Sequence, residues 1–311
     1  MLRLATRGSP LALRQTESVA EQLRALRGLI EIEPLVVMTR GDRHRELPLD
    51  RIGGQGAFVK EVQLAVLEGR ADAAVHSAKD LPSDSSTGLR LACVPRREDP
   101  RDVLVGSTLD ELGPGGVVAT GSVRRRAQLA NLRPDLTFVE LRGNIGTRLE
   151  RARDGTVDAV VTAMAALRRL GLEDRAAQVL SPLQMLPQVG QGALALECRD
   201  DDASTAELLA SLDDPESRRH LVAERSVLAT LGASCAAPVG AYAETARDGT
   251  LELEALLASG DGRILVRARR RGSDPVATGR ELARALVADH GGSAIEGVGA
   301  IEGVGPLEGA S

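Results

Sequence analysis

Residues 2–13, LRLATRGSPLAL, establish the fold class that later parts of the chain repeat. Leu2–Ala5 is predicted to form a short strand that ends in a polar turn. Ser9 then suits a helix N-cap and Pro10 the first helical position, and apolar residues follow at helical spacing as far as Leu26. A strand that turns directly into a capped helix is typical of an α/β protein.

The alternation of strand and helix continues along the chain. A strand at Leu35–Met38, a helix over Ala57–Leu67 and a strand at Ala73–His76 complete a β-α-β-α-β order, which predicts a mostly parallel sheet. The order restarts after the Pro- and Asp-rich residues 95–102. The elements expected there are strands at Val117–Ala119, Thr137–Leu141 and Val157–Val161 and a helix over Ala163–Leu170.

A third region, from about Glu216, has a different pattern. A helix that ends near Leu231 precedes strands around Leu251–Leu256 and Ile264–Arg267, which predicts an α+β module. The Gly-rich tail repeats IEGVG and is expected to be disordered. Two similar α/β units followed by a smaller module predict a bilobed protein, with a ligand cleft beyond the carboxyl ends of the strands.

Composition excludes several function classes. The 311 residues contain three aromatic side chains (Phe58, Phe138 and Tyr242) and no Trp, which argues against a base-stacking nucleic-acid module. The formal net charge of −5 argues against a general polyanion binder. The first residues lack an apolar signal-peptide core and no stretch approaches 18 apolar residues, so neither export nor a membrane span is expected.

Cysteine usage indicates a reducing compartment. The chain has Cys93, Cys198 and Cys235, an odd number at wide spacings and without a C-x-x-C motif. Neither a disulfide scaffold nor a metal site is therefore expected, and a cytoplasmic location fits best. Cys93 and Cys198 lie in apolar, strand-like settings, whereas Cys235 lies in a loop of small residues, where a free surface thiol and a nucleophile are equally compatible with the sequence.

Basic residues gather at the strand-to-helix turns. Arg124–Arg126 fall in the first turn of a helix, where each cation opposes the helix dipole at a cost of about 0.3–1 kcal/mol. An anion that neutralises them would explain this placement, and the hydroxyls of Thr120 and Ser122 would add donors to it. For any single arginine the alternative is a solvated basic helix end. Several such turns at one predicted cleft favour a site for carboxylates or phosphates.

Asp80 is the one acid expected within this basic set. It follows the predicted strand that holds His76, in the sequence AVHSAKDLP. Two interpretations are open: Asp80 pairs with Lys79 or an arginine, or it stabilises a cationic intermediate or handles a proton. His76 is interpreted as a packed, hydrogen-bonded histidine.

The ordered set of motifs resembles one family, porphobilinogen deaminase, also called hydroxymethylbilane synthase. The motifs lie in family order between Leu4 and about Tyr242. They read LATRGSPLAL, VMTRGD, GGQGAFVKE, ADAAVHSAKDLP, EDPRD, TGSVRR, LRGNIGTRL, LRRLGL, VGQGA and ASCAAPVG. The resemblance implies two lobes similar to those of periplasmic binding proteins and a smaller α+β domain that carries the cysteine. The boundaries expected from it are 1–97 with 192–214, 98–191, 215–295 and a disordered tail over 296–311.

The resemblance also implies an activity and its residues. Four porphobilinogen molecules would condense, with loss of ammonia, onto a dipyrromethane cofactor held through a thioether by Cys235, and hydroxymethylbilane would be released by a cytoplasmic monomer. Asp80 would be the catalytic carboxylate. The residues implied to bind acetate and propionate side chains are Arg7, Lys79, Arg124, Arg125, Arg142, Arg148 and Arg169. Ser9, Ser77, Thr120, Ser122 and Gln191 would support them, and Gln55 and Phe58 would belong to a mobile loop.

Three departures from the family pattern affect loop behaviour and rate rather than the reaction. Gln55 stands where relatives often have Lys, Gly121 where Ser is common, and Ala233-Ser234 precede the cysteine in place of a pair that ends in Gly. Two other functions also fit part of the sequence: a non-catalytic bilobed binding protein for carboxylated ligands, and an enzyme-like remnant with a regulatory role. The first leaves the third domain and its loop cysteine unexplained.

Overall fold

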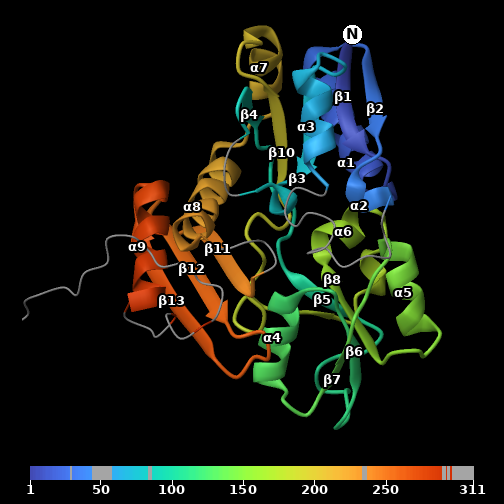
Figure 1. The fold of residues 1–311 in the computed structure, drawn as a ribbon, viewed down its shortest axis with the longest axis vertical. Helices are drawn as coiled ribbons and strands as arrows, with labels where there is room; N and C mark the ends of the chain where they lie inside the picture. Colours follow the sequence, from blue (N-terminus) through green and yellow to red (C-terminus); the bar gives the residue numbers. More distant parts are fainter. Residues whose placement is uncertain are drawn as a thin grey trace, which may run out of the picture.

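The computed structural model describes residues 1–28, 30–43, 58–82, 86–232 and 237–288, together with residues 292 and 295. These residues form two five-stranded sheets, each flanked by helices, and a three-stranded sheet covered by two longer helices (Figure 1). The α/β class with a smaller α+β part is therefore confirmed. None of the described helices is long and apolar enough to cross a bilayer.

The first sheet has the strand order β2-β1-β3-β10-β4. Its strands are β1 (Leu2–Arg7), β2 (Ile32–Val37), β3 (Ala73–Ser77), β4 (Leu89–Cys93) and β10 (Leu194–Arg199). The elements around it are α1 (Pro10–Arg27), α2 (Arg40–Arg43), α3 (Lys60–Leu67), the 3-10 turn η2 (Ala78–Asp80) and α7 (Ala203–Ala210).

Helix α1 begins as its sequence predicts. The Ser9 Oγ accepts a hydrogen bond from the amide of Ala12, and Pro10 is the first helical residue. Val19 and Leu23 are fully buried and pack with Leu4 of β1, so the apolar stripe of the helix covers one face of the sheet. The predicted role of Ser9 as an N-cap is confirmed.

The second sheet has the order β7-β6-β8-β5-β9. Its strands are β5 (Asp102–Val105), β6 (Val117–Ala119), β7 (Thr137–Val139), β8 (Ala159–Ala163) and β9 (Gln178–Val179). Its helical elements are α4 (Val123–Leu132), α5 (Ile145–Arg153), α6 (Met164–Arg169) and the 3-10 turn η3 (Glu173–Arg175).

The sheets are mostly parallel in strand direction, as predicted, but one strand in each, β10 or β5, runs the other way. In each five-stranded sheet two pairings are parallel and two are antiparallel. The antiparallel strand β10 starts opposite the end of β3, with Leu194 beside Ser77, and β5 starts opposite the end of β8, with Asp102 beside Ala163. The first residues of β5 and β10 therefore lie at the carboxyl ends of neighbouring strands, where α/β proteins bind ligands.

The third sheet has the order β11-β12-β13 and is antiparallel throughout. It contains β11 (Val239–Thr245), β12 (Leu251–Ala258) and β13 (Leu265–Gly272), and its helices are α8 (Pro215–Leu231) and α9 (Pro275–Ala288). One face packs against α8 and α9 in a single apolar core (Figure 1). The other contributes Leu256 to a smaller cluster with Ala127 of α4.

Two connections join the five-stranded sheets, and they are bonded to each other. Residues 94–101 lead from β4 to β5, and residues 180–193 lead from β9 to β10. The amide of Glu98 donates to the carbonyl of Gly192 at 3.2 Å. A Cβ at position 192 would lie 2.3 Å from the Glu98 carbonyl, and its φ is +87°, so this close approach requires glycine.

Most predicted elements lie within a few residues of the observed ones. The strand Val117–Ala119 and the end of α8 at Leu231 agree with prediction, whereas the helix expected from Ala57 begins at Lys60. The residue assignment of the sheets is compatible with the expected domain boundaries, which stay a prediction. The tail over 296–311 lies outside the described residues.

Candidate active site

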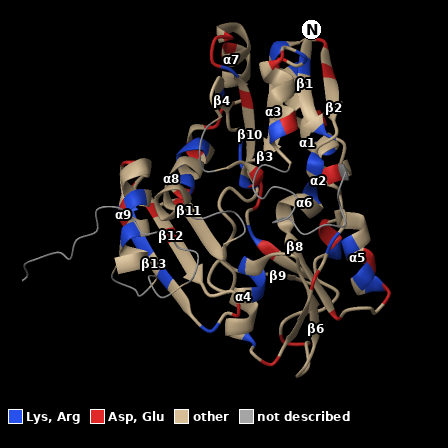
Figure 2. Ribbon diagram, viewed as in Figure 1, with Lys and Arg blue, Asp and Glu red and all other residues tan. Residues whose placement is uncertain are grey.

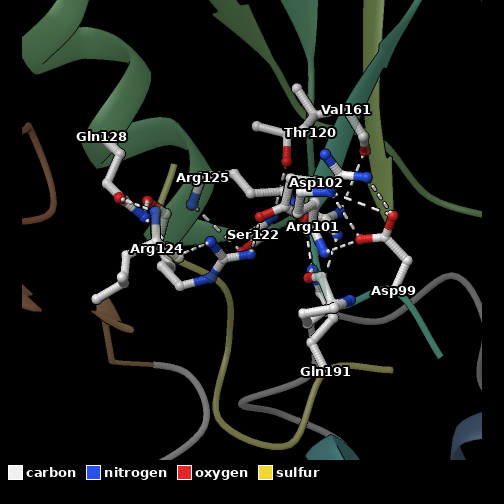
Figure 3. A network of polar contacts seen from close by, with 12 residues as sticks. Asp99, Arg101, Asp102, Thr120, Ser122, Arg124, Arg125, Gln128, Val161 and Gln191 are labelled. Atoms are coloured by element: carbon white, nitrogen blue, oxygen red, sulfur yellow. Dashed lines mark hydrogen bonds and ion pairs between the residues drawn. The ribbon is translucent and has the colours of Figure 1, made fainter. Parts of the chain in front are cut away.

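The carboxylate of Asp102 is the centre of a buried polar group (Figure 3). Arg124 Nη2 donates to its Oδ2 at 2.8 Å, and Arg125 Nε donates to its Oδ1 at 3.0 Å. Gln191 Nε2 donates to the same Oδ1 at 2.9 Å. Asp102 is 0% exposed, Arg124 3% and Arg125 7%, so this charge cluster is held away from bulk water.

The N-terminus of α4 supplies the two arginines. The Ser122 Oγ accepts a bond from the amide of Arg125 and caps the helix, and the Thr120 Oγ1 accepts one from the amide of Ser122. The sequence predicts an anion beside these arginines, and the structure places the Asp102 carboxylate there, paired with both Arg124 and Arg125. Arg126 is exposed and belongs to the solvated face of the helix.

The charges in this group affect one another strongly. Burial would raise the pKa of Asp102, but Arg124 and Arg125 outweigh it, so the pKa is lowered and the carboxylate is ionised. Burial lowers the pKa of Arg124, whose Nε is a buried donor without a hydrogen-bond partner. The Nη1 of Arg124 donates a hydrogen bond to the carbonyl of Leu186. Two cations face one carboxylate, so the group keeps an excess of positive charge.

Lys79 and Asp80 lie on η2, at the carboxyl end of β3. The pKa of Lys79 is lowered to about 8, first by burial and then by the charge of Arg125, while Asp80 and Asp102 oppose the shift. Lys79 is therefore electrostatically part of the Asp102 group. Within the described ranges, the half-buried Asp80 carboxylate accepts no hydrogen bond and has no ion-pair partner. It is thus available to a bound group, although Lys79 is its neighbour.

Arg148 and Arg169 are two further cations with little compensating charge. The pKa of Arg148 is lowered to about 10, first by burial and then by the charges of Arg125 and Arg142, while Asp80 opposes the shift. Burial likewise lowers the pKa of Arg169 to about 10, and its Nη2 donates to the carbonyl of Gly192, next to Gln191. These shifts favour binding of an anion, because a bound carboxylate would offset the cost of burying a guanidinium.

The arginines elsewhere in the chain have a different environment. Figure 2 shows basic residues along β13 as well as on α4 and α5. On β13, Arg269 pairs with Glu254 and Arg271 with Glu252, and both arginine side chains are more than half exposed. Exposed pairs of this kind contribute about 0–1 kcal/mol and need no ligand. Burial distinguishes Arg124 and Arg125 from the arginines that reflect Arg-rich composition.

Arg7 is positioned by contacts outside the Asp102 group. Its Nη2 lies 2.7 Å from Asp42 Oδ1, and its guanidinium lies 4.0 Å from the ring centre of Phe58. Ser77, at the end of β3, exchanges hydrogen bonds with Gln15. Arg142 pairs with Glu140 at 2.5 Å. The structure therefore joins Arg124, Arg125 and Gln191 through Asp102. Arg7 and Ser77 end the neighbouring strands β1 and β3, whereas Arg142 follows β7 of the second sheet.

Two residues predicted for the site, Cys235 and Gln55, lie outside the described residues. The other two thiols match expectation: Cys93 and Cys198 are buried on β4 and β10, and burial raises both pKa values, that of Cys93 to about 12. A buried thiol with a raised pKa is a poor nucleophile. His76 is buried as predicted, with Nε2 3.2 Å from Glu197 Oε2.

Sequence reasoning missed Asp102, and Asp80 is consequently not the only acid of the basic set. The available signal was a single carboxylate that opens the buried strand DVLV, because a buried charge needs partners. The structure also explains Gly121. A Cβ there would lie 2.7 Å from the carbonyl of Leu141, so a serine at this position would require the backbone to move.

Comparisons with solved structures find distant similarity. A nutrient binding protein from Burkholderia cenocepacia bound to methionine is 13% identical, covers 70% of this chain and 93% of its own, and has a TM-score of 0.42. A double mutant of the BvgS VFT2 domain from Bordetella pertussis is 19% identical, covers 72% and 91%, and has a TM-score of 0.39. Scores this low support no statement about ligand or activity.

Comparison with protein families is decisive. Residues 2–207 match the model of the dipyrromethane cofactor binding domain of porphobilinogen deaminase, and residues 219–288 match the C-terminal domain of the same enzyme. The two matches cover nearly all of the described chain. The protein therefore belongs to the porphobilinogen deaminase family.

Proposed function

We propose that the Asp102 group, Lys79 and Arg148 bind the carboxylates of cofactor and substrate while Asp80 acts on the reacting pyrroles. The activity itself follows from the family: four porphobilinogen molecules condense onto a dipyrromethane primer, and hydroxymethylbilane is released. The observation that carries the assignment of roles is the Asp80 carboxylate, which has no hydrogen-bond or ion-pair partner among the described residues and lies close to cations whose pKa values burial lowers.

The residues present fit a polycarboxylate cofactor. A dipyrromethane built from porphobilinogen carries acetate and propionate groups, and it supplies the pyrrole carbon to which the first substrate unit is joined. Arg124 has a buried donor without a partner, and burial lowers the pKa values of Lys79, Arg148 and Arg169. Carboxylates would satisfy these groups, because ionised acceptors form the strongest hydrogen bonds with guanidinium. We assign the cofactor's side chains to this set and its attachment to Cys235.

Asp80 is suited to stabilise developing positive charge. Loss of ammonia from porphobilinogen leaves a cationic electrophile, and attack by a pyrrole places positive charge on a ring nitrogen. A fixed carboxylate beside that nitrogen would lower the barrier, since preorganised charges act most strongly where transition-state charge develops. The arginines would meanwhile hold the acidic side chains away from the reacting atoms. Asp102 would keep Arg124 and Arg125 oriented without touching the reacting atoms.

The compartment and assembly state are part of the same proposal. Cys93 and Cys198 are free and buried, which suits a reducing compartment such as the cytoplasm. We also propose that the protein is a monomer. Light scattering on the purified protein would test this point.

The test of the proposed function is reaction stoichiometry. Purified protein is incubated with porphobilinogen, and ammonia and linear tetrapyrrole are measured over time. The proposal requires four ammonia molecules and one tetrapyrrole for every four porphobilinogen molecules consumed. A protein that binds porphobilinogen but releases no ammonia would support the non-catalytic binding protein instead.

Cys235→Ser is expected to lack the covalent cofactor and all turnover. A serine hydroxyl is a much weaker nucleophile than a thiolate, so the thioether cannot form. Mass spectrometry of the denatured variant should give the unmodified chain. Cys198→Ala is the matched control and should keep the cofactor, because Cys198 is buried on β10. A modified Cys235→Ser chain would assign attachment to another cysteine.

Substrate affinity is expected to fall as pH rises through about 8. Lys79 has a pKa of about 8, so it loses its proton and its attraction for carboxylates above that pH. KM for porphobilinogen should rise several-fold between about pH 7 and about pH 9. In Lys79→Arg this rise should disappear, because arginine stays charged over the whole range. A rise that persists unchanged in Lys79→Arg would assign it to another group.

A further inference from the structure

A buried ion pair between Arg97 and Glu224 lies where three segments of the chain meet. Arg97 Nη1 donates to Glu224 Oε1 at 2.6 Å, and Nη2 donates to Oε2 at 3.1 Å. The Glu224 side chain is 0% exposed and the Arg97 side chain 8%. A buried pair of this kind contributes little net stability compared with apolar side chains of similar size. Its remaining hydrogen bonds are therefore the better guide to its role.

Those bonds all go to backbone groups of other segments. Glu224 Oε2 accepts from the amide of Gly190 at 2.8 Å, and Oε1 accepts from the amide of Ala243 at 3.0 Å. Arg97 Nε donates to the carbonyl of Gln191 at 2.8 Å. This ion pair therefore joins the two segments that link the five-stranded sheets, residues 94–101 and 180–193, to α8 and to β11.

On one side, the pair reaches the Asp80 segment and the Asp102 group. Gly190 has a φ of +70°, and a Cβ there would lie 3.1 Å from the carbonyl carbon of Ala78, which begins η2. Gln191, the next residue, donates to Asp102. A shift of residues 190–191 would therefore move a contact of Asp102 and the surface against which η2 packs.

On the other side, the pair holds both elements that flank Cys235. Glu224 lies on α8, which ends at Leu231, and Ala243 lies on β11, which begins at Val239. Cys235 lies between them in the sequence. The hydrogen bond from the amide of Ala243 to Glu224 therefore holds β11 against α8, and these are the elements that follow and precede Cys235 in the sequence.

We propose that the Arg97–Glu224 pair is a positioning element that holds α8 and β11, which precede and follow Cys235 in the sequence, in register with η2 and the Asp102 group. This inference rests on the proposed function, because it assigns Cys235 to the cofactor and Asp80 to the reaction. Neither Arg97 nor Glu224 is placed against the substrate; both act through backbone groups of Gly190, Gln191 and Ala243.

The test replaces the pair by apolar side chains of similar length, in Arg97→Met/Glu224→Leu, and compares the variant with wild type. Thermal unfolding, the intact mass of the denatured chain, kcat and KM are measured on both. The melting temperature should fall, because the buried amides of Gly190 and Ala243 lose their acceptor. Fewer chains should carry the mass of two pyrrole units. In the loaded chains kcat should fall about 10- to 100-fold, with KM nearly unchanged, as expected for misplaced reacting groups.

The matched control is Asp213→Asn. Asp213 precedes α8 and pairs with Arg218 of that helix at 2.7 Å. The pair bonds to the carbonyl of Ala92 and the amide of Val94, and within the described residues no bond joins it to residues 190–191 or to β11. The control should lower the melting temperature and leave cofactor loading and kcat as in wild type. A well-folded double variant with wild-type loading and kcat would overturn the inference.

If the double variant does not fold, hydrogen exchange of the wild-type protein tests whether Glu224 holds the two backbone segments. In the wild-type protein the amides of Gly190 and Ala243 should exchange slowly, because each donates to buried Glu224. Rapid exchange at both would overturn the inference without any variant. Failure of the proposed function gives a different result, since wild type itself would then carry no added mass and release no ammonia.

Discussion

Asp80→Asn is expected to fold, to carry the cofactor and to lose turnover by about 10²–10³-fold or more. The amide keeps the size of the carboxylate but removes the charge that would face the reacting pyrrole nitrogens. Because the Asp80 carboxylate has no hydrogen-bond or ion-pair partner in the described part of the chain, its loss should disturb the fold little. The measurement is single-turnover kinetics with porphobilinogen on the cofactor-loaded variant.

The matched control for Asp80→Asn is Asp72→Asn. Asp72 lies just before β3 and pairs with Arg3 near the opposite end of the strand. This change removes the same charge at a distance from the site and should leave kcat within about twofold, as for most surface substitutions. An Asp80→Asn variant that kept more than a few per cent of the wild-type rate would remove Asp80 from the catalytic role.

Asp102→Asn is expected to have the largest effect on stability. The substitution leaves Arg124 and Arg125 buried without their shared counter-charge, and breaking a buried pair costs about 3–5 kcal/mol. The free energy of unfolding, from urea denaturation, should fall by about that amount, and turnover should fall with it. The pKa of Lys79 should also decrease, because Asp102 raises it in the wild-type protein. The pH at which KM rises should therefore move downward.

Asp99→Asn provides the comparison for Asp102→Asn. Asp99 also pairs with an arginine, Arg101, at 2.6 Å, but the Arg101 side chain is 42% exposed. The expected loss of stability is about 1 kcal/mol, with no change in the pH dependence of KM. Equal losses in the two variants would contradict the assignment of Asp102 as the centre of a buried charge cluster.

The sequence predicted those features that depend on neighbouring residues, such as helix caps and short apolar strands. The Ser9 cap and Pro10 fixed the start of α1, and the run Val117–Ala119 gave β6 with its observed bounds. The boundary of α3 was missed by three residues, because apolar spacing does not specify where the first turn forms. The Arg-rich turns were recognised because consecutive cations in a first helical turn conflict with the helix dipole.

The organisation of the site around Asp102 depends on contacts that local patterns do not contain. Asp102 meets Arg124 across 22 residues and Gln191 across 89. It reaches them because β5 and β10 run antiparallel to their neighbours and begin at the carboxyl ends of β8 and β3. The sequence analysis predicted no strand at Asp102–Val105, and local patterns do not show that β5 runs opposite to its neighbours.

The central claim is that this chain carries a dipyrromethane on Cys235 and extends it with porphobilinogen. Intact mass spectrometry of the denatured protein, with and without added porphobilinogen, followed by peptide mapping, tests it most directly. The account requires a mass excess of two pyrrole units on the peptide that contains Cys235, and a ladder of further units when substrate is added. An unmodified chain whose mass no amount of porphobilinogen changes would contradict the account.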